Sequence, residues 1–474
     1  MQVLVVLAQA GGVVVSRHAL IERCWDGRIV GENAINRVIS LVRALGADIG
    51  ANAFELETIT KVGYRMIVKG APAPAWAASP SATKDRRARR RVVLAGGAIA
   101  MIGAAGLGWY SLRRRPPSRA ARELYDKALL AQRQGLPEQT SQSVGFLREA
   151  VRIDPEFAGA WGALALSYRH QLEGASGADQ ATVAGWITAA ADRALSLDPD
   201  NADAQVARIL IKPHYRNWTS ADAAYREMLK RYPDHWLLRG TFGRLMQEVG
   251  RWREAIPPFR ANVAADPFLP VSRYFLAQGL WNSGQWQEAE TIIEGAFTRW
   301  PTHPMIWLQR FDFLANTGRP AAAIAFASNA PDRPLGPPEA FFTNLIAMAQ
   351  ALESGATADI EKAVALALTS ARSGPDSIPR AVQTLALMGR LDPAFGLLDS
   401  YFLQKASADT RAAEIGPLTR RITNFLFSQS TARLRDDPRF AVLTEAIGLE
   451  AYWRATRSAP DYRRAGAQGP APRS

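Results

Sequence analysis

The sequence predicts a mainly α-helical protein with three parts: a small N-terminal α+β domain, a single transmembrane helix and a C-terminal α-solenoid of paired helices. Three observations predict this fold class. Prolines recur every 34 residues at Pro199, Pro233, Pro267 and Pro301, which is the period of stacked helix-turn-helix repeats. Residues 92–112 contain no charged side chain. Residues 1–69 pass from helical to alternating apolar patterns.

Residues 1–69 are predicted to form three helices followed by a β-hairpin. The first helix ends at Gly11-Gly12, and Ser16 is placed to cap a second helix over residues 17–24. Residues 54–60 alternate as a strand, residues 61–63 turn the chain, and residues 64–68 return. Three helices and a hairpin make a winged helix. The third helix has an apolar stripe at helical spacing, made of Ile35, Val38, Ile39, Val42 and Leu45.

Three segments of this domain resemble the C-terminal DNA-binding domain of OmpR/PhoB-type transcription regulators: GGVVVSRHALIERCW, ENAINRVISLVRALG and LETITKVGYRMIV. The wing motif, Thr58 followed by Gly63-Tyr64-Arg65, is the most diagnostic part. With an apolar span behind it, the arrangement resembles the CadC/ToxR-like membrane-anchored regulators. That family domain begins with a small four-stranded sheet, whereas this chain starts inside the first helix. We therefore expect a winged helix that lacks its first β-sheet, either truncated at its N-terminus or degenerate.

In a winged helix, the third helix would lie in the major groove of double-stranded DNA. Arg37 and Asn36 suit guanine and adenine edges, and Thr60 and Lys61 on the wing would touch the backbone or the minor groove. The alternative is a merely solvated helix face. The net charge of +13 favours an anionic partner, because residues 1–91 hold 14 Lys and Arg against 7 Asp and Glu. Leu41 stands where the family has a basic residue. The predicted DNA-binding residues are Asn33, Asn36, Arg37, Ser40, Arg43, Thr60, Lys61 and Arg65.

Residues 70–91 are predicted to be a linker, rich in Pro and Ala and then basic. Residues 92–112 are long enough to cross a bilayer as a helix, with arginines on both sides; the alternative is a buried core helix. The span and its flanking charges predict a single-pass membrane protein that contacts lipid and favour a cytoplasmic N-terminus. The resemblance to CadC/ToxR-like regulators implies the bacterial inner membrane and a periplasmic C-terminal domain. Ala100, Ala104 and Gly108 form a stripe of small residues that would support a homodimer or simply face lipid.

Residues 120–405 are predicted to form an α-solenoid of six to seven repeats that resemble tetratricopeptide (TPR) repeats. Glycines and tryptophans keep the 34-residue period, and we expect the tryptophans to be core residues. About ten residues are inserted near residues 173–182, and the register blurs after Arg319. Residues 406–462 are predicted to be a helical cap and residues 463–474 a disordered tail. The periodic positions include Gly250, Gly284, Gly318, Trp218, Trp252 and Trp286.

The predicted function is a membrane-anchored one-component transcription regulator that binds DNA through its cytoplasmic winged helix and senses a protein or peptide partner through its periplasmic solenoid. The alternative is an interaction scaffold whose front domain has lost DNA binding. We expect neither an enzyme nor a metal or cofactor site, since the sequence has no Ser-His-Asp set, Walker loop or HExxH motif. A single cysteine, Cys24, rules out an intramolecular disulfide.

Overall fold

The computed structural model describes residues 2–10, 12, 14–16, 19–20, 24, 39, 42, 54–59, 63–68, 116–133, 136–174, 177–405 and 421–464. It divides into two compact units, Met1–Tyr110 and Ser111–Ser474, which are described separately below. The predicted linker over residues 70–91, the start of the predicted cap (406–420) and residues 465–474 of the predicted tail lie outside the described residues.

Among the described residues, the front unit has the helix α1 (Gln2–Gln9) and a three-stranded antiparallel sheet in the order β1-β3-β2. Its strands are β1 (Val15–Ser16), β2 (Phe54–Ile59) and β3 (Gly63–Val68). The hairpin of β2 and β3 confirms the predicted wing strands. The sequence did not predict β1, in which Val15 pairs with Tyr64. The Ser16 hydroxyl accepts the backbone N–H of Ala19 at 3.1 Å, as an N-cap residue does.

A small apolar core joins the helix and the sheet of this unit. Leu56 and Met66 are cross-strand partners on one face of the hairpin, and both are buried. Burying this face leaves Glu55 and Glu57 on the other side, because side chains alternate along a strand. Ile39 and Val42, which belong to the predicted stripe of the third helix, are each 2% exposed. The stripe therefore faces the core at the two positions that the structure describes.

The prediction of a transmembrane helix has to be corrected. Residues 92–112 lie outside the described residues, and among those described no helix is both long and apolar enough to cross a bilayer. The longest of them has 21 residues but carries Asp179, Asp192 and Arg193, whereas a spanning helix needs about 20 predominantly apolar residues. The single transmembrane helix of the fold class and the inner-membrane localisation are both withdrawn. The stripe of small residues over 100–108 also lies outside the described residues.

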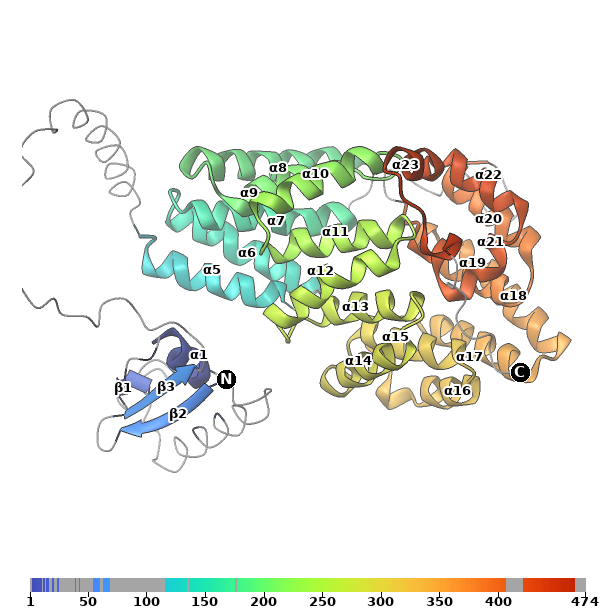
Figure 1. Cartoon of the computed structure of the whole chain (residues 1–474), viewed down its shortest axis with the longest axis horizontal. Helices are drawn as coiled ribbons and strands as arrows, with labels where there is room; N and C mark the ends of the chain where they lie inside the picture. Colours follow the sequence, from blue (N-terminus) through green and yellow to red (C-terminus); the bar gives the residue numbers. More distant parts are fainter. Residues whose placement is uncertain are drawn as a thin grey trace, which may run out of the picture. The chain divides into compact units, whose positions relative to one another are not determined.

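The second unit is a series of helix pairs that confirms the predicted TPR-like solenoid (Figure 1). Between residues 119 and 403 the described part holds eight pairs, against the six to seven expected. The pairs are α5 (Arg119–Gln132) with α6 (Pro137–Ile153), α7 (Ala158–Gly174) with α8 (Gly177–Leu197), α9 (Ala202–Leu210) with α10 (Trp218–Arg231), α11 (Trp236–Glu248) with α12 (Trp252–Ala265), α13 (Pro270–Asn282) with α14 (Trp286–Arg299), α15 (Pro304–Asn316) with α16 (Pro320–Ser328), α17 (Glu339–Ser354) with α18 (Thr357–Ala371), and α19 (Ile378–Leu387) with α20 (Leu391–Leu403).

The periodic residues determine how each pair turns. Gly250, Gly284 and Gly318 follow the first helix of their pairs with φ values of +75°, +88° and +74°. This left-handed conformation ends a helix at little cost only for glycine. The residue after each glycine donates its N–H back into the helix, as Arg251 does to the Met246 carbonyl at 2.7 Å. Of the alanines at the same period, Ala255, Ala289 and Ala323 are fully buried where helices cross.

Two irregularities explain where the sequence period fails. The expected insertion lengthens the second pair, since α7 and α8 have 17 and 21 residues whereas α13 and α14 have 13 and 14. After Arg319, α16 has only 9 residues and is followed by a short 3-10 helix, η1 (Ala330–Asp332), before α17 starts. Another short 3-10 helix, η2 (Pro375–Ser377), precedes α19. The 34-residue period is therefore lost where residues form longer connections and not helices.

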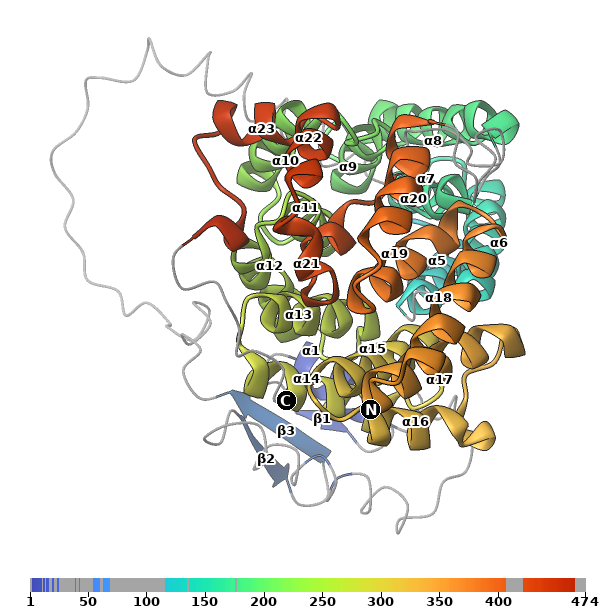
Figure 2. The same ribbon diagram turned by 90° about the vertical axis from the view of Figure 1, so that its right-hand side faces the viewer.

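Residues 421–464, here called the C-terminal segment, return from the last pair to the middle of the solenoid. The segment contacts α19 and α20, and also α10 and α11. In both views α23 lies beside α10 (Figures 1 and 2). The expected helical cap thus bridges the eighth pair to the third and fourth. Its elements are η5 (Asn424–Phe427), η6 (Gln429–Thr431), α21 (Ala432–Arg435), α22 (Pro438–Ala446), α23 (Leu449–Ala455) and η7 (Asp461–Arg463).

Candidate functional site

Only one of the predicted DNA-binding residues belongs to the described part of the chain. Arg65 lies on β3, where its Nε and Nη2 atoms donate to Glu57 Oε2 on β2 at 3.0 and 2.6 Å. Both side chains are between a third and two fifths exposed. The ion pair holds the guanidinium against the hairpin and offsets part of its charge, so a contact of Arg65 with DNA stays a prediction. The other seven, Asn33, Asn36, Arg37, Ser40, Arg43, Thr60 and Lys61, lie outside the described residues.

The second candidate site is a cavity of about 1180 Å³ in the solenoid unit. One wall consists of the glycine turns of the fourth, fifth and sixth pairs, Gly250, Gly284 and Gly318. The C-terminal segment also lines the cavity, with Phe427, Gln429, Arg435 and Tyr462 among others, and α17 and α19 contribute further residues. Aromatic rings, amides and charges of both signs line the cavity. Such a mixed lining suits a polypeptide better than a purely apolar ligand.

Tryptophan indoles fasten the C-terminal segment to the middle of the solenoid. Trp218 and Trp252, at equivalent positions of the third and fourth pairs, donate their Nε1–H groups to the carbonyls of Ile447 and Phe427 at 2.9 and 3.0 Å. In the reverse direction, Trp453 of the segment donates to the Val249 carbonyl at 2.9 Å. All three indoles are at most 3% exposed. These buried bonds satisfy main-chain carbonyls that would otherwise lack a partner.

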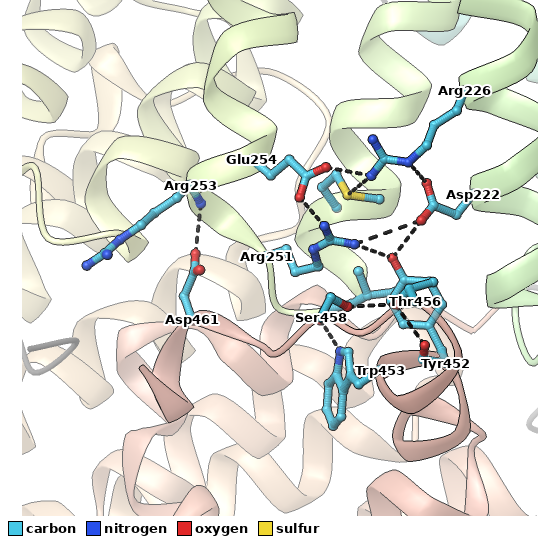
Figure 3. Close-up of polar contacts among 12 residues, drawn as sticks. Asp222, Arg226, Arg251, Arg253, Glu254, Tyr452, Trp453, Thr456, Ser458 and Asp461 are labelled. Atoms are coloured by element: carbon cyan, nitrogen blue, oxygen red, sulfur yellow. Dashed lines mark hydrogen bonds and ion pairs between the residues drawn. The ribbon is translucent and has the colours of Figure 1, made fainter. Parts of the chain in front are cut away.

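A cluster of charged residues surrounds Tyr452 at the same junction (Figure 3). The Tyr452 hydroxyl donates to Asp222 Oδ2 at 3.0 Å and accepts a hydrogen bond from Arg251 Nη1 at 2.7 Å. Arg226 bridges Asp222 and Glu254 at 2.6 and 2.5 Å, and Arg251 also bonds Glu254. Two arginines therefore balance two carboxylates. Burial raises the pKa of Tyr452 above its ordinary range, so its hydroxyl stays a donor at alkaline pH where an exposed tyrosine would ionise.

Asp461 secures the last turn of the segment beside Gly250. Its backbone N–H donates to the Gly250 carbonyl at 2.8 Å, and its Oδ2 accepts the backbone N–H of Arg253 at 2.8 Å (Figure 3). Burial raises the pKa of the Asp461 carboxyl. The helix start at Trp252–Arg253 is thus capped from a residue more than 200 positions along the chain.

Buried tyrosines predict how stability depends on alkaline pH. Burial raises the pKa of both Tyr215 and Tyr401 from an ordinary 10.0 to about 12. The folded state therefore keeps these protons when the unfolded chain has lost them. Their contribution to stability is fully present below pH 10 and is lost as the pH rises toward 12. Burial raises the pKa to about 12 also in Tyr125, Tyr225 and Tyr274.

We expect the urea midpoint of unfolding to fall steadily between pH 10 and 12. Ultraviolet absorbance of the phenolate, followed in the native and the urea-unfolded protein, measures the tyrosine titration directly. In the native protein a large share of the 11 tyrosines should ionise later than in urea. A single native transition that coincides with the unfolded one would contradict this prediction.

The sequence predicted the burial of the periodic tryptophans but missed their second role. Trp218 and Trp252 are core residues as expected, at 1% and 2% exposure. Their bonds to the C-terminal segment left no periodic signal, because the segment itself lies outside the repeat. Trp286, the third of the series, is only half-buried and lines the cavity. The one hint available was the concentration of aromatic residues in the segment, which includes Phe425, Phe427, Tyr452 and Trp453.

Comparison with solved structures finds helical repeat proteins at low identity. A tetratricopeptide repeat protein from Parabacteroides merdae is 18% identical, with a TM-score of 0.30, over 52% of this chain and 94% of that one. Yeast Tom70 is 13% identical, with a TM-score of 0.36, over 71% and 69%. Since both TM-scores are low, the helix pairs described above carry the repeat assignment. No curated protein matches the chain.

The front unit matches a family model. Residues 1–66 match the family described as the C-terminal domain of transcriptional regulatory proteins, as the segments around Ser16, Asn36 and Tyr64 predicted. The match covers β1, β2 and β3 as far as Met66, and the positions of the predicted DNA-binding residues. The chain therefore joins the DNA-binding domain of a transcription regulator to a TPR-like helical solenoid.

Proposed function

We propose that the protein is a transcription regulator that binds double-stranded DNA through residues 1–69 and responds to a protein or peptide partner bound by its solenoid. It acts by binding and not by catalysis. The observation that carries this proposal is the match of residues 1–66 to a transcription regulator domain on the same chain as a repeat solenoid with a large, mixed-polarity cavity.

The DNA-binding half of the proposal draws support from charge and from the hairpin. Residues 1–91 carry 14 basic against 7 acidic side chains, which favours contact with phosphates. The β2–β3 hairpin gives the domain its wing. A third helix whose stripe packs Ile39 and Val42 inward would present Asn36, Arg37, Ser40 and Arg43 on its other face, since residues three and four apart share one side of a helix.

The test is selection of bound duplexes from a random DNA pool by the full chain, followed by anisotropy titration at several salt concentrations. We expect selective binding whose affinity falls with salt. Replacing Arg37 with alanine should weaken binding to the selected site by about 1–3 kcal/mol and relax the sequence preference at one base position. The matched control is Arg231→Ala, which removes an equal charge from the solenoid surface and should change neither quantity.

Two results would contradict the proposal. Binding without sequence selectivity, unchanged by Arg37→Ala, would leave the front domain without a regulatory role. The interaction scaffold would then be the better description. Selective DNA binding that no solenoid ligand ever alters would remove the response to a partner while leaving the DNA-binding role intact.

A further inference from the structure

The C-terminal segment uses the repeat period to hold its own main chain. Trp218 and Trp252, one repeat apart, each donate an indole N–H to a carbonyl of the segment. In the fifth pair, Asn282 Oδ1 accepts the backbone N–H of Gln429 at 3.0 Å. Adjacent repeats thus offer a donor from the start of the second helix and an acceptor from the end of the first. Both of these groups bind peptide main chain.

The same two groups recur further along the solenoid, where no described residue bonds them. Trp286 follows Trp252 by 34 residues, and its buried Nε1 makes no hydrogen bond to any residue that the structure describes. Asn316 follows Asn282 by the same interval, and its buried Oδ1 is also unbonded within the described residues. Both residues line the cavity. Gly284 lies beside the indole, because a Cβ at this position would stand 3.9 Å from Trp286 Nε1. The absence of a side chain there leaves space for a ligand atom next to the indole.

We propose that this cavity binds an extended peptide of a partner protein, whose main chain bonds the next repeat through the same kinds of groups that hold the C-terminal segment. A carbonyl of the peptide accepts the Trp286 Nε1–H, and an N–H donates to Asn316 Oδ1. This inference rests on the proposed function, because it names the site and the class of partner that the solenoid would sense.

Three further observations favour a peptide as the occupant. A buried donor or acceptor without a hydrogen bond costs about 1–3 kcal/mol, so a ligand that bonds both groups would recover that free energy on binding. A peptide main chain supplies both complementary groups at a regular spacing. The cavity, at about 1180 Å³, exceeds the range of about 300–1,000 Å³ typical of small-molecule pockets. The neighbouring repeats already hold main chain through the equivalent atoms.

The experiment pans a phage library of random linear peptides against the full chain and measures the affinity of the enriched peptides by fluorescence anisotropy. Trp286→Phe removes the indole donor but keeps an aromatic ring, and Asn316→Leu removes the acceptor at similar size. Each should weaken binding by about three- to tenfold, as expected for one hydrogen bond. The matched control is Trp281→Phe, whose indole N–H is also unbonded within the described residues but does not line the cavity.

Amide-to-ester replacement along the peptide tests whether main chain is recognised. An ester at one position removes the N–H that bonds Asn316 Oδ1 and should weaken binding of the peptide to the natural chain. The same ester should cause no further loss of affinity for the Asn316→Leu variant, which already lacks this acceptor. The proposal would be overturned if the peptides bound all three variants with equal affinity, or if panning enriched no peptide. It would also be overturned if peptide binding exposed residues 421–464 to hydrogen exchange. DNA selection on the same preparations separates these failures from a failure of the proposed function, because it does not depend on the cavity.

Discussion

Replacing Trp252 with alanine is expected to destabilise the solenoid by about 3–5 kcal/mol, the usual range for a fully buried tryptophan. The side chain is 2% exposed, and its indole N–H bonds the Phe427 carbonyl at 3.0 Å. The substitution leaves a cavity in the core and a buried carbonyl without its donor. Because Phe427 belongs to the C-terminal segment, the loss should loosen the attachment of residues 421–464 as well as the fourth repeat.

Urea unfolding measures the change in stability, and hydrogen exchange with mass spectrometry measures the protection of residues 421–464. The matched control is Trp286→Ala, at the same helix position one repeat along. Trp286 is half-buried and its indole N–H bonds no described residue, so its loss should cost markedly less and leave the segment protected. Equal losses of stability for the two variants would show that the bond from Trp252 to the segment does not contribute measurably to the free energy of unfolding.

Gly250→Ala is expected to cost about 2–5 kcal/mol, because strain and a steric clash add. The backbone φ of +75° disfavours any side chain by about 1–2 kcal/mol. In addition, a Cβ would stand 2.9 Å from Pro460 Cβ and 3.0 Å from Phe427 Cδ1. Both contacts belong to the C-terminal segment, so the new methyl group should push the segment away from the turn.

Gly284→Ala and Gly318→Ala are matched controls, since they share the repeat position and the positive φ. A Cβ at Gly318 would meet nothing within 4 Å, and one at Gly284 would meet only Trp286 Nε1 at 3.9 Å. These variants should therefore show the conformational cost alone. Thermal unfolding and proteolysis at the segment compare the three. If Gly250→Ala matched the two controls, the segment would not be packed against this turn in solution.

Much of the helical architecture could be predicted because its causes are local. Glycine at the turns, alanine at the crossings and proline after the second helix act on neighbouring residues, so a period of 34 residues indicates the pairs directly. The hairpin could be predicted for the same reason, from alternation over residues 54–60 and 64–68, close to the observed strands. The pattern failed where loops replaced helix pairs, as between α16 and α17.

The apolar stretch over residues 92–112 lies outside the described residues. Its length and its lack of charge predicted a transmembrane helix, and the described residues contain no helix that could cross a bilayer. Hydropathy records the transfer preference of side chains. It does not establish that a helix forms or what surrounds it.

The sequence by itself determined the helix pairs, the winged-helix hairpin and the burial of Trp218 and Trp252. Only the tertiary structure decided that the C-terminal segment returns to the middle of the solenoid and closes one wall of a cavity. The bond from Trp252 to Phe427 spans 175 residues, and no periodic pattern records a contact made once between a repeat and a segment outside it. Such a contact depends on the curvature accumulated over all the intervening helix pairs, which the residues of any single repeat do not specify.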